Sequence, residues 1–296
     1  MSLATTDLEA AYPKLPFWDA VSFAYYTYVT NFKDVLRASW LWLIVAAALT
    51  ATAGRWQSSW MATAMQKDGL PRPPPPTELV ALTELNNAVM IFAGVSIAVA
   101  WHRFMILGER PTFCGSNVVS RNLWRYLIFG FLLCALMFVP IAINLFPFRY
   151  FLPGFATVTM NTHSGPTVLA LVLGFFALYA AATIVALRLC LLLPARAVGG
   201  TEHTLRQTWK RTRGNTWRLF WGIALTTALP LLVAQFITLA WISSGHWPIS
   251  PGELPIRMLV ASPIIAAYSL LVLPIGIGFL SLAYGHFFVR PLELPE

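Results

Sequence analysis

The chain has 296 residues, of which 57% are hydrophobic and only 11% are charged. An ordinary soluble domain carries about 25% charged residues, so these charges are too few to cover the surface of a soluble protein of this length. The 12 Trp and 9 Tyr suit a membrane, because aromatic rings collect at the level of the lipid headgroups. The composition excludes a typical soluble enzyme and predicts an integral membrane protein.

The N-terminal segment carries no basic region followed by an apolar run, so we expect no signal peptide. The next segment, residues 17–36, has apolar residues at helical spacing. This pattern predicts an amphipathic helix that lies in the headgroup plane. Its apolar stripe consists of Phe17, Val21, Ala24, Tyr28, Phe32 and Val35.

Six apolar segments follow, each long enough as a helix to cross a hydrocarbon core of about 30 Å. Because lipid offers the backbone no hydrogen-bond partners, we expect these segments to be helical. The predicted fold class is an all-α, polytopic membrane helix bundle: six transmembrane helices plus amphipathic interfacial helices, in one integral membrane domain over 1–296. The six segments lie at about 38–54, 86–107, 126–147, 166–193, 219–243 and 257–286.

The distribution of Lys and Arg predicts the orientation. If the N-terminus lies inside the cell, fifteen of these cations fall on inner segments and five on outer loops. Inner loops of membrane proteins are enriched in Lys and Arg, so this bias predicts that both termini are cytoplasmic. The outer five are Arg55, Lys67, Arg72, Arg149 and Arg257.

A short pattern recurs where cytoplasmic segments enter odd-numbered spans. NLWRYL at 122–127 aligns with NTWRLF at 215–220, and NFKDVL at 31–36 precedes them by a similar step. The pattern predicts parallel repeats, each an interfacial helix followed by a transmembrane hairpin. The alternative is convergence, since aromatic and basic residues gather at membrane interfaces anyway. The repeat units would be 17–110, 111–198 and 199–290.

The most basic segment runs from Arg206 to Arg218, directly before the fifth apolar segment. Residues 202–218 predict a second interfacial helix, capped near Thr201, whose cations lie close to lipid phosphates. Each cation near an anionic leaflet contributes on the order of 1 kcal/mol. A lipid surface is much nearer to this segment than nucleic acid, so we expect no nucleic-acid partner. The candidate lipid-binding residues are Arg103, Arg125, Arg188, Arg206, Lys210, Arg211, Arg213 and Arg218.

Charges at the inner end of the second span leave two interpretations open. Arg103, like Arg188 near the inner end of the fourth span, either holds a headgroup phosphate through two parallel hydrogen bonds or serves only as an orientation anchor. Glu109 and Arg110 follow it and are interpreted as an ordinary loop pair.

Catalytic and cofactor motifs are missing from the sequence. It contains no GxSxG, GxxxxGK[ST], HExxH or GxGxxG motif, so we expect no catalytic residue, no cofactor and no metal. Cys114, Cys134 and Cys190 are widely spaced and are interpreted as buried free thiols. His102 and His286, both near inner ends of spans, leave one alternative open, a haem or metal held between helices.

The segment from Leu187 to Phe220, LRLCLLLPARAVGGTEHTLRQTWKRTRGNTWRLF, resembles the loop of a bacterial group of six-span membrane proteins. That group includes the YciC-like proteins and the membrane domain attached to some glycerophosphodiester phosphodiesterases. Residues 17–42 resemble it loosely. The resemblance implies a helical bundle with interfacial helices and a role in the bacterial envelope. The phosphodiesterase catalytic domain is absent from this sequence, so the resemblance implies no hydrolase activity.

These patterns together predict a non-enzymatic inner-membrane protein. Its expected role is that of a scaffold or complex subunit whose cytoplasmic rim binds anionic phospholipids, with other membrane protein subunits as candidate partners. The alternative is a transporter or permease for a lipid or small molecule, with a path between the hairpins. Polar residues inside spans, such as Thr226 and Thr227, fit either a contact between helices or such a path. An enzyme acting on lipid headgroups would need acid or His groups clustered at one interface.

Overall fold

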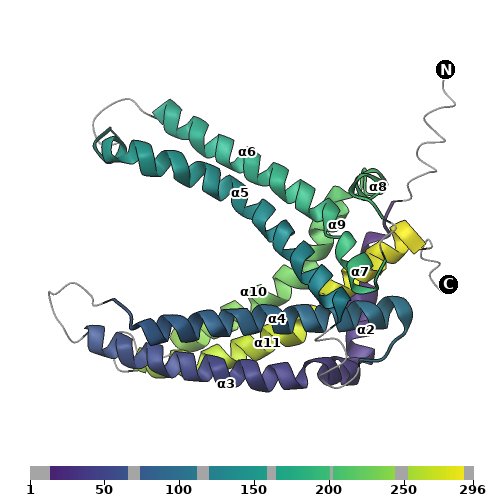
Figure 1. Ribbon diagram of the computed structural model, residues 1–296, viewed down its shortest axis with the longest axis horizontal. Helices are drawn as coiled ribbons and strands as arrows, with labels where there is room; N and C mark the ends of the chain where they lie inside the picture. Colours follow the sequence, from purple (N-terminus) through teal and green to yellow (C-terminus); the bar gives the residue numbers. More distant parts are fainter. Residues whose placement is uncertain are drawn as a thin grey trace.

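The computed structural model describes residues 14–65, 74–111, 120–158, 165–200, 203–243 and 253–289. Over these residues the protein consists of helices and short turns, with no strand (Figure 1). The all-α prediction is therefore confirmed. In chain order the helices are α2 Phe17–Thr30, α3 Phe32–Met65, α4 Thr77–Leu107, α5 Arg121–Val158, α6 Gly165–Leu189, α7 Leu192–Ala197, α8 Leu205–Arg211, α9 Thr216–Ile223, η1 Ala224–Ala228, α10 Leu229–Ser243, α11 Glu253–Tyr284 and η2 Gly285–Val289.

Five stretches of the described residues are helical, long and apolar enough to cross a membrane, which is compatible with a multi-pass membrane protein. The predicted span at 166–193 coincides with α6, where the apolar stretch with described side chains, Leu173–Leu189, is shorter. The fourth predicted span, and with it the total of six, therefore stays a prediction. The five stretches are Phe32–Met61, Thr77–Leu107, Arg121–Pro140, Thr216–Trp241 and Leu259–Val289.

The first interfacial helix is shorter than predicted. Helix α2 ends at Thr30, and α3 begins at Phe32, before the expected start of the first span at residue 38. The side chain of Asn31 explains the break, because its amide donates to the Thr27 carbonyl at 2.9 Å and closes the last turn. Helix α2 then runs across the ends of the long helices, as Figure 1 shows. Its buried face consists of Ala20, Val21, Ala24 and Thr27.

Helix α11 is the central helix of the bundle. It packs along α3 and α4, and it also contacts α2, α7, α9 and α10. Of its apolar window, 56% is buried, against 11% for the window in Thr216–Trp241. The end of α11 that meets α2 and α9 therefore forms the main core, with Phe279 fully buried beside Leu15 and Leu219.

Glycines allow the stretch Thr216–Trp241 to approach α11 closely. Gly222 lies against the ring of Phe279, and a methyl group at Gly222 would overlap that ring. Gly276 lies in the same way against the hydroxyl of Thr227. Lipid tails are as apolar as the side chains, so helices in membranes associate through such close contacts between small residues.

The stretch Thr216–Trp241 contains an irregular turn. Residues Ala224–Ala228 form the π-helical segment η1 between α9 and α10. A π-turn contains an extra residue and disturbs the regular pairing of backbone carbonyls. The hydroxyl of Tyr25 on α2 donates to the Leu225 carbonyl at 2.7 Å. Tyr25 therefore connects the interfacial helix to the irregular turn and supplies a donor to a backbone group there.

Helices α5 and α6 form a hairpin that leaves the bundle. They pack on each other, while their contacts with the rest of the protein are mainly to α4, α7, α8 and α9 near one end (Figure 1). Along the arm, α5 exposes Phe131, Leu132 and Phe138. Cys134 is also exposed on α5, so its interpretation as a buried thiol is wrong. These apolar side chains can face lipid without loss, because lipid and protein interiors are similarly apolar.

The threefold repeat stays a prediction. Its three Asn residues do stand at helix starts, with Asn31 before α3, Asn122 in the first turn of α5 and Asn215 at the N-cap of α9. The hairpins that follow them pack differently, however, since the α5–α6 hairpin diverges from the others (Figure 1). The interfacial helix of the middle unit would fall mostly on residues 112–119, outside the described part of the chain.

Candidate functional site

The short helix α8 carries three of the eight predicted lipid-binding cations, Arg206, Lys210 and Arg211. Thr204 caps it: its hydroxyl accepts from the Gln207 backbone, and the Gln207 side chain accepts from the Thr204 backbone. The predicted cap, Thr201, lies outside the described residues. Thr208 and Thr212 are fully buried and fix α8 to the bundle. The opposite side of the helix is therefore free to carry exposed side chains.

The predicted continuous helix over 202–218 is wrong. Helix α8 ends at Arg211, and α9 begins only at Thr216. Gly214 lies in the turn between them with a φ of 80°, a backbone conformation that favours glycine. The break separates the basic helix from the span, so α8 lies across the end of the bundle while α9 enters it (Figure 1).

Three cations form the exposed edge that we call the α8 rim: Arg206, Lys210 and Arg213. Among the described residues, none of the three takes part in an ion pair. Leu205 and Trp209, also exposed, lie one position before Arg206 and Lys210 on α8. Cations beside exposed apolar groups are typical of a helix that lies in the headgroup plane of a membrane.

Other predicted lipid-binding residues are engaged within the protein. The guanidinium of Arg188 donates to the Thr216 hydroxyl at 2.8 Å and lies 4.2 Å from the centre of the Trp209 ring. Arg211 donates to the carbonyl of Phe287 at 2.8 Å. These contacts connect α6, α8 and η2, so Arg188 and Arg211 have a structural role at this end of the bundle.

Arg103 pairs with Glu109, the acid that the sequence analysis paired with Arg110. Its guanidinium donates to both oxygens of Glu109, at 2.8 and 2.9 Å. The predicted loop pair of Glu109 with Arg110 is therefore wrong, because Glu109 occupies the two parallel donors of Arg103. A headgroup phosphate would have to compete with this carboxylate. Arg125 is partly buried in α5 and stays a lipid-binding prediction.

A buried polar cluster joins three helices near the same end. His102 of α4 lies 2.7 Å from the hydroxyl of Ser281 on α11, through Nδ1, and 3.5 Å from the hydroxyl of Tyr126 on α5, through Nε2. Ser281 also donates to the Ile277 carbonyl at 2.9 Å. With Nδ1–H donating to Ser281 and Tyr126 donating to Nε2, every polar hydrogen in the cluster has an acceptor.

The same cluster contains a Ser–His pair, the combination used for nucleophilic catalysis. The exposed fractions of His102, Ser281 and Tyr126 are 0%, 3% and 7%, so no substrate reaches them in this structure. The arrangement is that of a connection between α4, α5 and α11. Among the described residues, no group of three or more His, Cys, Asp or Glu could hold a metal ion, and His102 is paired with Ser281 rather than with His286.

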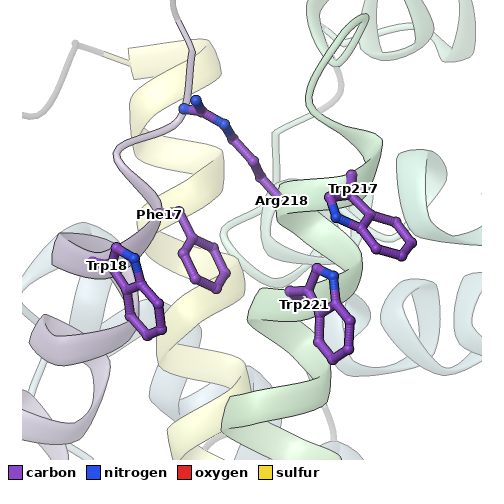
Figure 2. A pocket seen from close by; sticks show the side chains of 5 residues that line it. All are labelled: Phe17, Trp18, Trp217, Arg218 and Trp221. Atoms are coloured by element: carbon purple, nitrogen blue, oxygen red, sulfur yellow. The ribbon is translucent and has the colours of Figure 1, made fainter.

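A second site, which sequence analysis did not identify, lies between α2 and α9. Figure 2 shows a pocket lined by Phe17 and Trp18 from α2 and by Trp217, Arg218 and Trp221 from α9, with a volume of about 410 Å³. This volume falls in the range of small-molecule sites. The indoles of Trp217 and Trp221 are one helical turn apart, with ring centres 5.4 Å from each other. The pocket is therefore aromatic, with one guanidinium at its edge.

Hydrogen bonds hold the two walls of the pocket together. The backbone N–H of Leu15 donates to the Asn215 side chain at 2.9 Å, and the guanidinium of Arg218 donates to the Leu15 carbonyl at 2.5 Å. Leu15 and Asn215 are almost fully buried. Arg218 was predicted as a lipid contact, but its neighbours at the pocket come from a segment 200 residues earlier. The only signal of this site in the sequence is the group of aromatic residues next to the basic run.

No family model matches this chain, and neither a curated protein nor a solved structure matches it. The resemblance to the YciC-like group therefore stays a prediction.

Proposed function

We propose that this protein is a non-enzymatic, six-span protein of a bacterial inner membrane. In this proposal its cytoplasmic rim binds anionic phospholipids, and it acts as a scaffold or as a subunit of a membrane complex. The α6 helix, Gly165–Leu189, would supply the sixth span, since its 25 residues are long enough to cross a hydrocarbon core.

The single observation that carries the proposal is the α8 rim. Arg206, Lys210 and Arg213 are exposed and form no ion pair among the described residues, and exposed Leu205 and Trp209 lie beside them. Such cations gain by contact with lipid phosphates, whereas cations on an ordinary soluble surface usually face nearby carboxylates.

The proposed orientation of the protein in the membrane follows from the distribution of its cations and from their contacts. The described cations that charge counting assigns to the inside include Arg103, Arg188, Arg211 and Arg218. Contacts of these residues join α4 to α7, α6 to α9, α8 to η2, and α9 to the segment before α2. All of these elements lie at one end of the bundle, which favours a single cationic face turned toward the cytoplasm.

The test replaces the three rim cations together, as Arg206→Gln, Lys210→Gln and Arg213→Gln. At about 1 kcal/mol for each cation, we expect the number of phosphatidylglycerol or cardiolipin molecules retained in native mass spectrometry to fall several-fold. The matched control is Arg206→Lys with Arg213→Lys, which keeps the charge and should retain lipid. Equal retention by all three proteins would refute the rim as a lipid-binding surface.

A second function is favoured by the separation of the α5–α6 hairpin from the bundle (Figure 1). The exposed side chains along this arm include Phe131, Phe138 and Phe176. An apolar arm of this kind fits a path for lipids between the hairpins. Reconstituted vesicles with fluorescent phospholipid in both leaflets provide the test, since a transporter of this type would make the inner-leaflet dye accessible to dithionite. Vesicles whose inner-leaflet dye stays protected would remove this alternative.

A further inference from the structure

We propose that the pocket between α2 and α9 is a discrete site for one diacyl phospholipid, with its phosphate at Arg218 and its glycerol region against the indoles. This inference rests on the proposed function, because it requires this end of the bundle to lie at a headgroup layer. It goes further by naming one site, distinct from the α8 rim, and the part of the lipid that each side chain would recognise.

The polar end of the pocket has donors for a phosphate. A guanidinium carries five N–H donors, and the Leu15 carbonyl accepts from Nη1 of Arg218. This contact fixes the guanidinium at the edge of the pocket, above the rings in Figure 2. Lys14, which is exposed, precedes Leu15 in sequence and adds a second positive charge to this segment of the chain. A fixed guanidinium binds a phosphate with little further loss of side-chain freedom.

The aromatic walls fit the glycerol and the first methylenes of a lipid. The exposed fractions of Trp18 and Trp217, which line the pocket, are 68% and 67%, whereas Leu15 and Leu219, a few residues away in sequence, are fully buried in the core. Indoles of this kind prefer the layer between headgroups and acyl chains, because they are apolar but carry one N–H donor. In water these large apolar faces would stay exposed, whereas a lipid would cover them.

The surface below the pocket continues in the direction that acyl chains would take. The pocket holds about 410 Å³, which is much smaller than a diacyl lipid, so the chains must leave it. Beyond η1, the following helix α10 exposes Leu229, Leu232 and Phe236. We call these three residues the apolar track; they follow the pocket residues along the chain, after η1. Phosphate donors, indoles and apolar track therefore follow one another in the order of the parts of a phospholipid.

The test measures the first lipid bound. Purified protein in mild detergent is titrated with dioleoyl phosphatidylglycerol and, separately, with dioleoylglycerol, which lacks the phosphate, and binding is followed by native mass spectrometry. We expect one phosphatidylglycerol to bind more tightly than later copies, and dioleoylglycerol to bind about tenfold more weakly at that step. Arg218→Gln should weaken the first phosphatidylglycerol about tenfold, and Arg218→Lys should restore part of the affinity.

A variant on the α2 wall of the pocket distinguishes a loss of the lipid site from a folding defect caused by Arg218→Gln. Trp18→Leu on α2 should weaken the first lipid several-fold without touching the bond between Arg218 and Leu15. The matched controls are Arg55→Gln and Trp56→Leu, two adjacent exposed residues on α3 that lie outside the pocket, and both should leave the first affinity unchanged. A phosphatidylglycerol with a diazirine in its acyl chain should label peptides from 216–243 in the wild type and lose this label in Trp18→Leu.

The outcomes separate this site from the α8 rim. If the triple rim variant loses later lipids but keeps the first one, both proposals hold. If the pocket variants lower the first affinity and the rim variant changes nothing, the pocket holds and the rim proposal fails. Equal first-lipid affinity in wild type, Arg218→Gln and Trp18→Leu overturns the pocket. Equal binding of dioleoylglycerol and phosphatidylglycerol overturns the assignment of the phosphate to Arg218.

Discussion

The bundle around α11 and the α5–α6 hairpin are both built from apolar helices, yet they pack very differently. The apolar window of α11 is 56% buried, whereas that of Arg121–Pro140 in α5 is 17% buried. In α11, Gly276 and its neighbours let other helices approach within contact of the backbone. In α5, a methyl group placed at Gly130 would meet only a side-chain atom of Leu193 from another helix, at 3.9 Å. Apolarity places a helix in the membrane, and small residues at contact positions decide whether it joins a bundle.

The same substitution, Phe to Ala, should destabilise the protein much more in the bundle than in the hairpin. Phe279 of α11 is fully buried, and 64% of Phe138 on α5 is exposed. We expect Phe279→Ala to lower the free energy of unfolding by about 3–5 kcal/mol, because it leaves a cavity in the main core. Phe138→Ala should change it by less than about 0.5 kcal/mol. Thermal unfolding in mild detergent measures both, and similar losses for the two variants would show that the hairpin is packed after all.

Glycine substitutions sharpen the comparison by adding volume instead of removing it. Gly222→Ala places a methyl group into the ring of Phe279, so we expect a loss of about 1–3 kcal/mol in the free energy of unfolding. The control is Gly174→Ala in α6, where a methyl group meets no atom within 4 Å. Because alanine favours helix over glycine, Gly174→Ala should be neutral or slightly stabilising. A destabilised Gly174→Ala protein would contradict the open arrangement of α6.

The buried polar cluster can be tested with two serines. Ser281→Ala removes the hydroxyl that pairs with His102 across two helices and leaves a buried imidazole nitrogen without this partner, so we expect a loss of about 1–3 kcal/mol. Ser39 is also buried, but its hydroxyl donates only to the Val35 carbonyl one turn earlier in its own helix. Ser39→Ala should therefore cost less than about 0.5 kcal/mol. Equal losses in thermal unfolding would remove the cluster as a connection between helices.

The smallest expected effect concerns the bond between α2 and η1. Tyr25→Phe removes the donor to the Leu225 carbonyl and should lower the free energy of unfolding by about 1 kcal/mol at neutral pH. Burial, with a smaller contribution from Tyr268, raises the pKa of Tyr25 above its usual value of 10.0. The folded protein thus favours the neutral phenol, and this contribution to stability is complete below about pH 10 and decreases as the pH rises toward the raised pKa.

The alkaline loss of stability should therefore be smaller in Tyr25→Phe than in the wild type. Tyr26→Phe is the matched control, since the Tyr26 side chain is exposed on the same helix and should change neither quantity. Thermal unfolding between about pH 8 and about pH 11 measures the difference. Parallel pH curves for the wild type and Tyr25→Phe would argue against a role for this phenol at the irregular turn.

Much of the secondary structure could be predicted from the sequence, since uninterrupted apolar runs require helices in a lipid environment. Helix ends were harder, because they depend on local bonds. Asn31 closes α2 through the Thr27 carbonyl, and Gly214 separates α8 from α9. Neither residue interrupts the hydropathy pattern, so both predicted interfacial helices were too long.

The candidate site was likewise predictable from the sequence only in part. The basic run and the exposure of Arg206, Lys210 and Arg213 follow from composition alone, since clustered cations next to an apolar segment remain at the surface. The partners of Arg103 and Arg218 did not follow. Glu109 is six residues from Arg103, and the Leu15 carbonyl is 203 residues from Arg218.

The sequence by itself determined the solvent, the helical class and the uneven distribution of charge, because each of these depends on sums over many residues. Tertiary structure alone decided that α11 is central, that the α5–α6 hairpin diverges, and that Trp18 and Trp221 line one pocket. The physical reason is that lipid tails and side chains are equally apolar. Hydrophobicity therefore cannot select which helices touch, and the choice falls to close contacts between small residues and to a few hydrogen bonds.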